Sequence, residues 1–118
     1  MVRAGRGQDV SPRVEVADPD AALPILAATA AAWPGRALAL TGVTGTNGKT
    51  TVTHMLSSIL RAANTPHARV GTTGHWVVDQ EMPTLFTTPF PIALQRLLQT
   101  ARDRGATHAV MELSLIHI

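Results

Sequence analysis

Cysteine and tyrosine are both absent from this chain of 118 residues, and aromatic residues make up only 3% of it. Without cysteine the chain forms no disulfide framework and no thiolate metal site, which fits a cytoplasmic protein. The net charge is only +2, and no basic stripe with interleaved aromatic residues is present. Such stripes are typical of nucleic-acid-binding proteins. We therefore expect a cytoplasmic protein with no nucleic-acid partner.

Long hydrophobic runs are missing as well. The longest mainly apolar stretch, from Ala21 to Trp33, is shorter than a membrane-spanning helix, which needs about 20 residues. No basic segment leads directly into an apolar one near Met1, so no export signal is predicted. We expect no membrane partner. The remaining composition, 45% apolar and 15% charged, is typical of a globular protein, and the length suits one small domain.

A glycine-rich segment stands between an apolar run, Ala37 to Val43, and an amphipathic run, Val52 to Ala63. Strand, glycine-rich turn, Gly-Lys-Thr and helix form the layout of a phosphate-binding loop. Two glycines let backbone N–H groups approach phosphate oxygens, and the helix start offers further N–H donors. In this layout Lys49 reaches the β- and γ-phosphates and the Thr50 hydroxyl ligates Mg²⁺.

The loop departs from the general phosphate-binding pattern by one residue. That pattern is G-x-x-x-x-G-K-[ST], and counting back from Gly48 places its first glycine at Val43, whereas the glycine is Gly42. The compact form G-x-x-G-K-T-T is present instead. The alternative is a strand-to-helix turn that binds no ligand, but a Gly-Lys-Thr sequence has little structural purpose at such a junction.

The remaining pattern predicts an α/β fold, a partial P-loop-type parallel sheet with flanking helices. Asp18-Pro19-Asp20 is typical of a helix start, and this helix is expected to run to about Ala32. The other expected elements are strands at 37–43, 67–72 and 107–113, helices at 52–63 and about 90–101, a short strand near 14–16, and a hairpin of 75–78 with 81–85. Residues 1–14 show no periodicity.

Two burial patterns follow from the apolar residues. The run from Ala37 to Val43 predicts a buried core strand. In the following helix an apolar stripe at helical spacing is expected to face the sheet; it consists of Val52, Met55, Leu56, Ile59, Leu60 and Ala63.

Glu112 is predicted to stand at the end of the strand at 107–113. In open α/β sheets ligands bind at the carboxyl ends of the strands, so a carboxylate there can hold Mg²⁺ facing the loop. The alternative is a surface carboxylate at a strand end.

The motifs together resemble those of the Mur ligases, specifically the MurE type. The stretch from Thr41 to Thr51 is similar to the ATP loop of this family. Three further segments are similar to its T-T-P, L-Q-R-L-L and G-x-T-x-x-x-M-E segments, in the same order: Thr87 to Pro89, Leu94 to Leu98, and Gly105 to Glu112.

The resemblance implies an ATP-dependent amide-forming ligase of peptidoglycan synthesis. Such an enzyme adds an amino acid to UDP-N-acetylmuramoyl-L-alanyl-D-glutamate through an acyl phosphate, with ATP and Mg²⁺ as cofactors. The uridine-linked dipeptide and the amino acid are therefore the expected partners. The implied cofactor-binding residues are Gly45, Thr46, Asn47, Gly48, Lys49, Thr50 and Thr51, with Lys49 catalytic and Thr50 and Glu112 on the metal.

The resemblance also implies three substrate-binding residues, namely Thr87, Thr88 and Ser114. From the residues alone, the two threonines before Pro89 are equally well explained as a capping turn. The family usually has Asn before the threonine pair, where this chain has Phe86, so one expected polar contact is lost.

We expect residues 1–35 to be a remnant of an N-terminal domain with a linker helix, and residues 36–112 to be the first part of the ATP-binding central domain. The end of the chain, 113–118, departs from the family pattern after Ser114 and is predicted to be a non-native tail. We expect this polypeptide alone not to catalyse ligation. Two alternatives are a folylpolyglutamate- or cyanophycin-synthetase-type ligase, and an inactive nucleotide-binding remnant. A third, a P-loop kinase or GTPase-like switch, should show a general Walker spacing, and this one does not.

Overall fold

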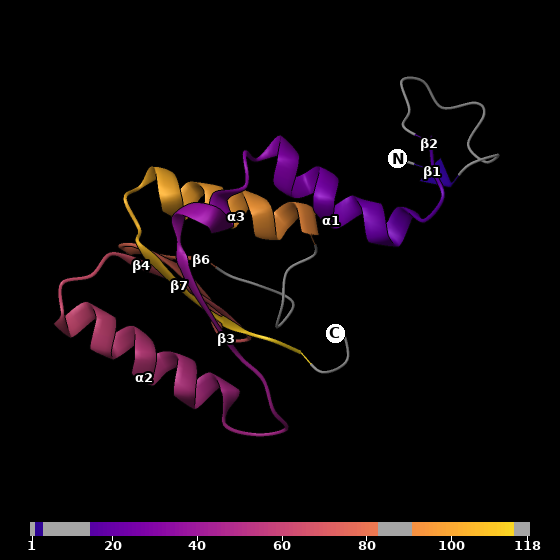
Figure 1. Ribbon diagram of the computed structural model, residues 1–118. Coiled ribbons are helices and arrows are strands. Elements are labelled where there is room, and N and C mark those ends of the chain that lie inside the picture. The colour runs from indigo at the N-terminus through magenta and orange to yellow at the C-terminus, as the bar shows by residue number, and fades with distance from the viewer. Residues whose placement is uncertain (1, 4–14, 83–90, 115–118) are drawn as a thin grey trace.

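The structure of the protein, a computed structural model, describes residues 2–3, 15–82 and 91–114 (Figure 1). At its centre lies a five-stranded sheet in the order β3-β7-β4-β5-β6. The strands are β3 (Ala39–Val43), β7 (His108–Glu112), β4 (His67–Gly71), β5 (Gly74–Val77) and β6 (Gln80–Met82). The first three run parallel, and β5 and β6 continue as antiparallel neighbours. This confirms the predicted α/β fold, and the predicted hairpin over its described part; residues 83–85 lie outside the described residues.

Helices cover both faces of the sheet. Figure 1 shows α2 (Lys49–Ala62) on one face and α3 (Pro91–Asp103) on the other, with α1 (Pro19–Ala30) packed along α3. The core lies between α3 and the sheet; its buried members are Leu38, Ala68, Val70, Val77, Leu97, Leu98, Ala101, Ala106, Ala109 and Met111. The predicted helix at about 90–101 is therefore confirmed over its described part.

Local signals fix the ends of the helices as expected. The Asp18 side chain accepts hydrogen bonds from the N–H groups of Asp20 and Ala21, which caps the start of α1. Gly105 takes a φ of 91° directly after α3, a conformation that glycine adopts without strain. The predicted strand near residue 15 is also present, since β2 (Glu15–Val16) pairs in parallel with β1 (Val2–Arg3).

The prediction of a buried core strand at 37–43 was wrong. A 3₁₀ helix, η1 (Pro34–Ala37), occupies the start of this stretch, and β3 begins only at Ala39. The strand is largely exposed, and 49% of the surface of Leu40 is accessible to solvent. The reason is strand order: β3 is the outermost strand in the described sheet, with β7 as its neighbour. An apolar composition predicts burial but does not reveal a strand's place in the sheet.

The prediction that the apolar stripe of α2 faces the sheet was also wrong. Met55 and Ile59 on that stripe are 60% and 62% exposed, whereas Thr53 and Ser57 are buried against the sheet. These two hydroxyls have polar partners on the sheet. The Oγ of Ser57 lies 2.6 Å from Nε2 of buried His67, and Thr53 donates to a carboxylate described below. The rotation of α2 is thus set by hydrogen bonds that the helical periodicity does not predict.

Candidate functional site

The glycine-rich loop connects β3 to α2 at the carboxyl end of the strand (Figure 1). Gly45 and Gly48 have φ values of 142° and 84°, which a residue with a side chain adopts only with strain. Gly48 caps α2 and provides no side-chain hydrogen bond to it. The first N–H groups of an α-helix have no partner within the helix, so those of α2 remain as donors toward the loop.

Lys49 lies at the start of α2 and folds back over the loop. Its Nζ donates a hydrogen bond to the carbonyl oxygen of Gly45 at 2.8 Å. The ammonium group therefore lies across the turn that the two glycines form. A positive charge and backbone N–H donors around one turn suit a phosphate group. Thr46, Asn47 and Thr51, also predicted to bind nucleotide, are exposed in the same segment.

Glu112 ends β7 and is completely buried, with 0% of its surface exposed. Its Oε2 accepts hydrogen bonds from Thr50 Oγ1 at 3.1 Å and from Thr72 Oγ1 at 3.3 Å. Its Oε1 accepts one from Thr53 Oγ1 at 3.4 Å. The alternative of a surface carboxylate is therefore wrong. Two of the predicted metal-binding residues, Thr50 and Glu112, are brought into contact across 62 positions of the sequence.

Gly71, the last residue of β4, makes room for this carboxylate. A Cβ added at Gly71 would lie 2.9 Å from Cδ of Glu112 and nearer still to Oε1. Real Cβ atoms do not approach other atoms so closely. The absence of a side chain at Gly71 thus allows Glu112 to lie flat against the strand, under the threonine hydroxyls.

The oxygens gathered here fit a hard divalent cation. Mg²⁺ prefers oxygen ligands and is usually bound in nucleotide sites by one or two carboxylates together with phosphate oxygens. Thr50 and Glu112 supply this donor type. In the described ranges no group of three or more His, Cys, Asp or Glu side chains is close enough to hold a metal by itself.

Arg69 adds a buried positive charge two residues before Gly71 on the same strand. It is 4% exposed, and its nearest acceptors are Thr73 Oγ1 and the Gly74 carbonyl, each at 3.5 Å. Burial lowers the pKa of Arg69, while the negative charges of Glu81 and Glu112 act in the opposite direction. Arginine nevertheless remains charged in proteins, so a fixed positive charge acts on the Glu112 carboxylate.

Three residues of this site were not predicted from the sequence, namely Thr53, Gly71 and Thr72. Gly71 and Thr72 stand at the carboxyl end of a strand parallel to β7, and that position was the available signal. Thr53 lay one helical turn from Thr50 on the face assigned to solvent, so the sequence offered no comparable signal.

The predicted substrate-binding residues are not tested here. Thr87 and Thr88 lie outside the described residues. Ser114 follows β7 at the same end of the sheet as the loop. The N–H of Leu113 donates to the Val43 carbonyl at 2.8 Å, which extends the pairing of β3 with β7 up to that point.

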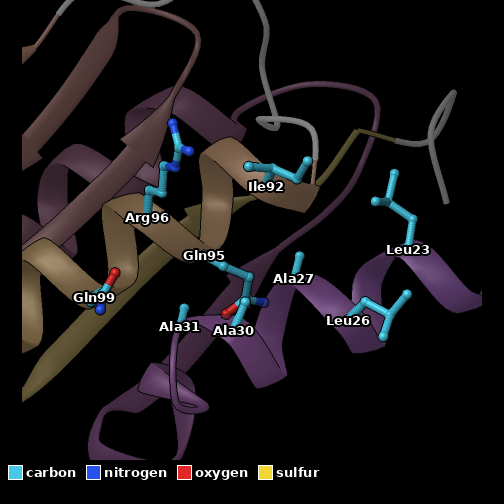
Figure 2. Close-up of a pocket in the computed structure, with 9 residues that line it drawn as sticks. All are labelled: Leu23, Leu26, Ala27, Ala30, Ala31, Ile92, Gln95, Arg96 and Gln99. Carbon is cyan, nitrogen blue, oxygen red and sulfur yellow. The ribbon is translucent and has the colours of Figure 1, made fainter. Parts of the chain in front are cut away.

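A groove of about 410 Å³ lies between α1 and α3 (Figure 2). Its α1 wall is apolar, with Leu23, Leu26 and Ala27 among its members, and Gln95 and Arg96 of α3 add polar groups. The groove contains no carboxylate and no glycine-rich turn. The groups suited to phosphate and metal are instead gathered at the loop.

Comparison with known proteins agrees with this geometry. The family described as "Mur ligase middle domain" matches residues 43–118, well over half of the chain. The chain belongs to the Mur ligase family. The matched stretch contains the glycine-rich loop and the buried carboxylate, and begins at the last residue of β3.

Individual Mur ligases are similar over most of this chain. The UDP-N-acetylmuramoyl-L-alanyl-D-glutamate–2,6-diaminopimelate ligase of Lactiplantibacillus plantarum is 38% identical over 117 residues, which is 98% of this chain and 24% of that protein. The enzyme of the same name from Corynebacterium efficiens is 39% identical over 109 residues, 92% of this chain and 21% of its own length. A solved structure of a ligase with this name matches with a TM-score of 0.64 at 30% identity, covering 85% of this chain and 21% of that one.

The chain thus spans about a quarter of the length of the curated relatives it matches. None of the helices in the described ranges combines the length and apolar composition that crossing a membrane requires.

Proposed function

We propose that this chain is the nucleotide-binding part of an ATP-dependent ligase that adds an amino acid to UDP-N-acetylmuramoyl-L-alanyl-D-glutamate in peptidoglycan synthesis. The observation that carries the proposal is the contact of Thr50 with buried Glu112, beside Lys49 and the two positive-φ glycines. The names of the relatives supply the substrate class, with 2,6-diaminopimelate as their amino acid. A cytoplasmic location follows from that reaction class.

In the proposed mechanism the loop binds the phosphates of ATP. The segment 45–51 donates backbone N–H groups from its glycines and from the start of α2, and the Lys49 ammonium leaves the Gly45 carbonyl to contact the β- and γ-phosphates. Thr50 and Glu112 would hold Mg²⁺, which when bound neutralises charge on the phosphates. Transfer of the γ-phosphoryl group to the substrate carboxylate then breaks the bond to the β-phosphate, releases ADP and gives an acyl phosphate, and attack by the amine forms the amide with release of phosphate.

The contribution of these residues is positioning and charge neutralisation, because phosphoryl transfer needs little covalent chemistry from the protein. Lys49 is the proposed catalytic residue, since it alone in the loop carries a positive charge to the transferred group. Thr87, Thr88 and Ser114 remain proposed contacts to the uridine-linked substrate.

The test is binding of a fluorescent ATP analogue with Mg²⁺ to the full chain. Loss of one charge-assisted contact costs about 1.5–3 kcal/mol, so Lys49→Ala should weaken binding by about tenfold to a hundredfold. Arg61→Ala is the matched control, because it removes a positive charge three turns further along α2. It should leave the affinity within about twofold of wild type, a difference below 0.5 kcal/mol. Equal affinities for wild type and Lys49→Ala would refute the proposed nucleotide site.

A further inference from the structure

The chain has two asparagines, and they stand in different surroundings. Asn47 precedes Gly48 in the glycine-rich loop, and Asn64 precedes Thr65 in the turn after α2. An asparagine is thermally labile when the backbone nitrogen of the next residue can reach its side-chain amide carbon. Glycine at that next position favours the reaction, because it has no Cβ to shield the nitrogen and adopts a wide range of backbone angles. Asn47–Gly48 is the only Asn-Gly or Asp-Gly pair in the sequence.

The structure leaves the Asn47–Gly48 pair open to this reaction. Both residues are exposed, and they lie between the end of β3 and the start of α2, outside both elements. A Cβ built on Gly48 would have nothing within 4 Å, so the space beside the glycine is empty. Neither the Gly48 N–H nor the Asn47 side-chain amide forms a hydrogen bond with another described residue. The attacking nitrogen and the amide carbon are therefore free to approach each other.

Asn64 is held in a way that slows the same reaction. Its own N–H donates to the Arg61 carbonyl at 3.0 Å, and the N–H of Thr65 donates to the Leu60 carbonyl at 2.9 Å. The nitrogen that would attack Asn64 is thus engaged at the end of α2. Thr65 is also β-branched, so its stiff side chain shields that nitrogen. The chain therefore contains its own control, an asparagine whose neighbouring nitrogen is protected.

We propose that Asn47 is a site of spontaneous covalent modification that ends phosphate binding by the loop. The Gly48 nitrogen attacks Cγ of Asn47, the new N–Cγ bond replaces the Cγ–Nδ2 bond, and ammonia leaves with the proton of the Gly48 nitrogen. Water then opens the cyclic imide at one of its two carbonyl carbons. The products are aspartate, with the backbone unchanged, or isoaspartate, in which the backbone runs through Cβ and Cγ.

Either product changes a loop that is suited to phosphate. Each adds a negative charge two residues before Lys49, whose Nζ lies on the Gly45 carbonyl. The new carboxylate repels phosphate and competes with it for the ammonium group. Isoaspartate also lengthens the backbone by one carbon before Gly48, which displaces the N–H groups at the start of α2. This consequence rests on the proposed nucleotide function, since phosphate is the ligand that the loop would lose.

Bound nucleotide should in turn protect Asn47. A phosphate in the loop accepts hydrogen bonds from the backbone N–H groups around it, and Gly48 supplies one of these groups. A nitrogen that donates to phosphate is no longer free to attack Cγ of Asn47. The empty loop is therefore modified with time, whereas the occupied loop is preserved.

The first experiment follows the modification in the full chain during incubation in mildly alkaline buffer at physiological temperature. Trypsin separates the two asparagines into peptides 37–49 and 62–69. Mass spectrometry should show conversion of asparagine in peptide 37–49 at least about tenfold faster than in peptide 62–69, because one attacking nitrogen is free and the other is hydrogen-bonded. A saturating ATP analogue with Mg²⁺ should slow the conversion in peptide 37–49 by about tenfold.

A matched variant separates the effect of structure from the effect of sequence. Thr65→Gly gives Asn64 the same following residue type that Asn47 has. Its nitrogen still lies at the end of α2, within reach of the Leu60 carbonyl. Peptide 62–69 of this variant should therefore still convert more slowly than peptide 37–49.

The second experiment links the modification to nucleotide binding. Modified chain, separated from fresh chain by its added negative charge, should bind the fluorescent ATP analogue at least about tenfold more weakly. Asn47→Asp, which copies one of the products, should show the same loss without incubation. Asn47→Gln has a side chain one methylene group longer and does not form the same ring. Its affinity, whatever the starting value, should stay constant during incubation, while wild type loses binding capacity in step with the conversion of peptide 37–49.

Three results would overturn the inference while leaving the proposed function intact. In the first, a chain that binds the ATP analogue converts peptide 37–49 no faster than peptide 62–69. In the second, modified chain binds the analogue as tightly as fresh chain does. In the third, bound analogue does not slow the conversion. A fresh wild-type chain that binds no analogue would overturn the proposed function and this inference with it.

Discussion

Replacing Gly71 by alanine should displace the buried carboxylate of Glu112. The added Cβ would lie 2.9 Å from Cδ and 3.3 Å from Cγ of Glu112. Gly71 is not among the glycines with positive φ, so the backbone itself tolerates alanine. The effect of the substitution is therefore steric and falls on Glu112. Since that side chain is enclosed and held by threonine hydroxyls on both oxygens, it cannot move without losing some of these bonds.

The expected cost combines two contributions. Overpacking of a filled interior costs about 1–3 kcal/mol, and a hydrogen bond to a charged group contributes about 1.5–3 kcal/mol. We therefore expect Gly71→Ala to lower the free energy of unfolding by about 3 kcal/mol, which corresponds to a fall in Tm of roughly 10 °C for a domain of this size. Mn²⁺ affinity should fall by about tenfold or more, because the displaced carboxylate no longer meets the threonine oxygens.

The assay is thermal unfolding followed by circular dichroism, together with a Mn²⁺ titration of the full chain with a non-hydrolysable ATP analogue, followed by electron paramagnetic resonance. Gly35→Ala is the matched control: its new Cβ would meet only the end of the Leu40 side chain, at 3.2 Å, and Tm should change little. Adding Glu112→Asp to Gly71→Ala withdraws the carboxylate by one methylene group and should restore part of the lost stability. A Gly71→Ala chain with wild-type Tm and wild-type Mn²⁺ affinity would show that Glu112 does not lie against Gly71.

Two further predictions concern buried histidines. Ser57→Ala removes the 2.6 Å partner of His67 Nε2 and should lower the free energy of unfolding by about 1–3 kcal/mol in a urea titration, whereas an unchanged midpoint would contradict the Ser57–His67 bond. Burial, and secondarily the charge of Arg69, lower the pKa of His75, so its imidazole takes up a proton more readily in the unfolded chain than in the folded one. Neutral His75 therefore contributes fully to the free energy of unfolding above the unfolded pKa of about 6.5. This contribution is lost as the pH falls toward the folded pKa, and the free energy of unfolding then changes by at most about 1.4 kcal/mol per pH unit. His75→Gln should flatten the dependence of urea stability on pH between about 7.5 and 5; an unaltered slope would contradict this assignment.

The local features of the site were predictable because their signals are local. Glycines that permit positive φ at Gly45 and Gly48, followed directly by Lys49 and a helix, specify the loop within a few residues of sequence. The end of β7 was likewise predictable, because a mainly apolar strand that ends in Glu112 places the carboxylate at the edge where open α/β sheets bind ligands.

The burial of α2 was not predictable in the same way. Helical periodicity finds an apolar stripe, and Met55 and Ile59 do form one, but it cannot show what the opposite face meets. Thr53 is buried because it bonds to Glu112, which lies 59 residues further along the chain. Ser57 is buried because it bonds to His67. A polar helix face that is buried by partners distant in sequence looks like a solvent face until the strand order is known.

The position of Lys49 has a consequence for covalent chemistry. It is the only lysine in the chain, so apart from the terminal amino group its ε-amine is the only primary amine present. That amine lies over the turn of the loop, against the Gly45 carbonyl. Any amine-directed reagent that modifies a lysine within these 118 residues must therefore enter the glycine-rich turn. The mass of a single acylated peptide reports whether the turn is open or filled, with no engineered label.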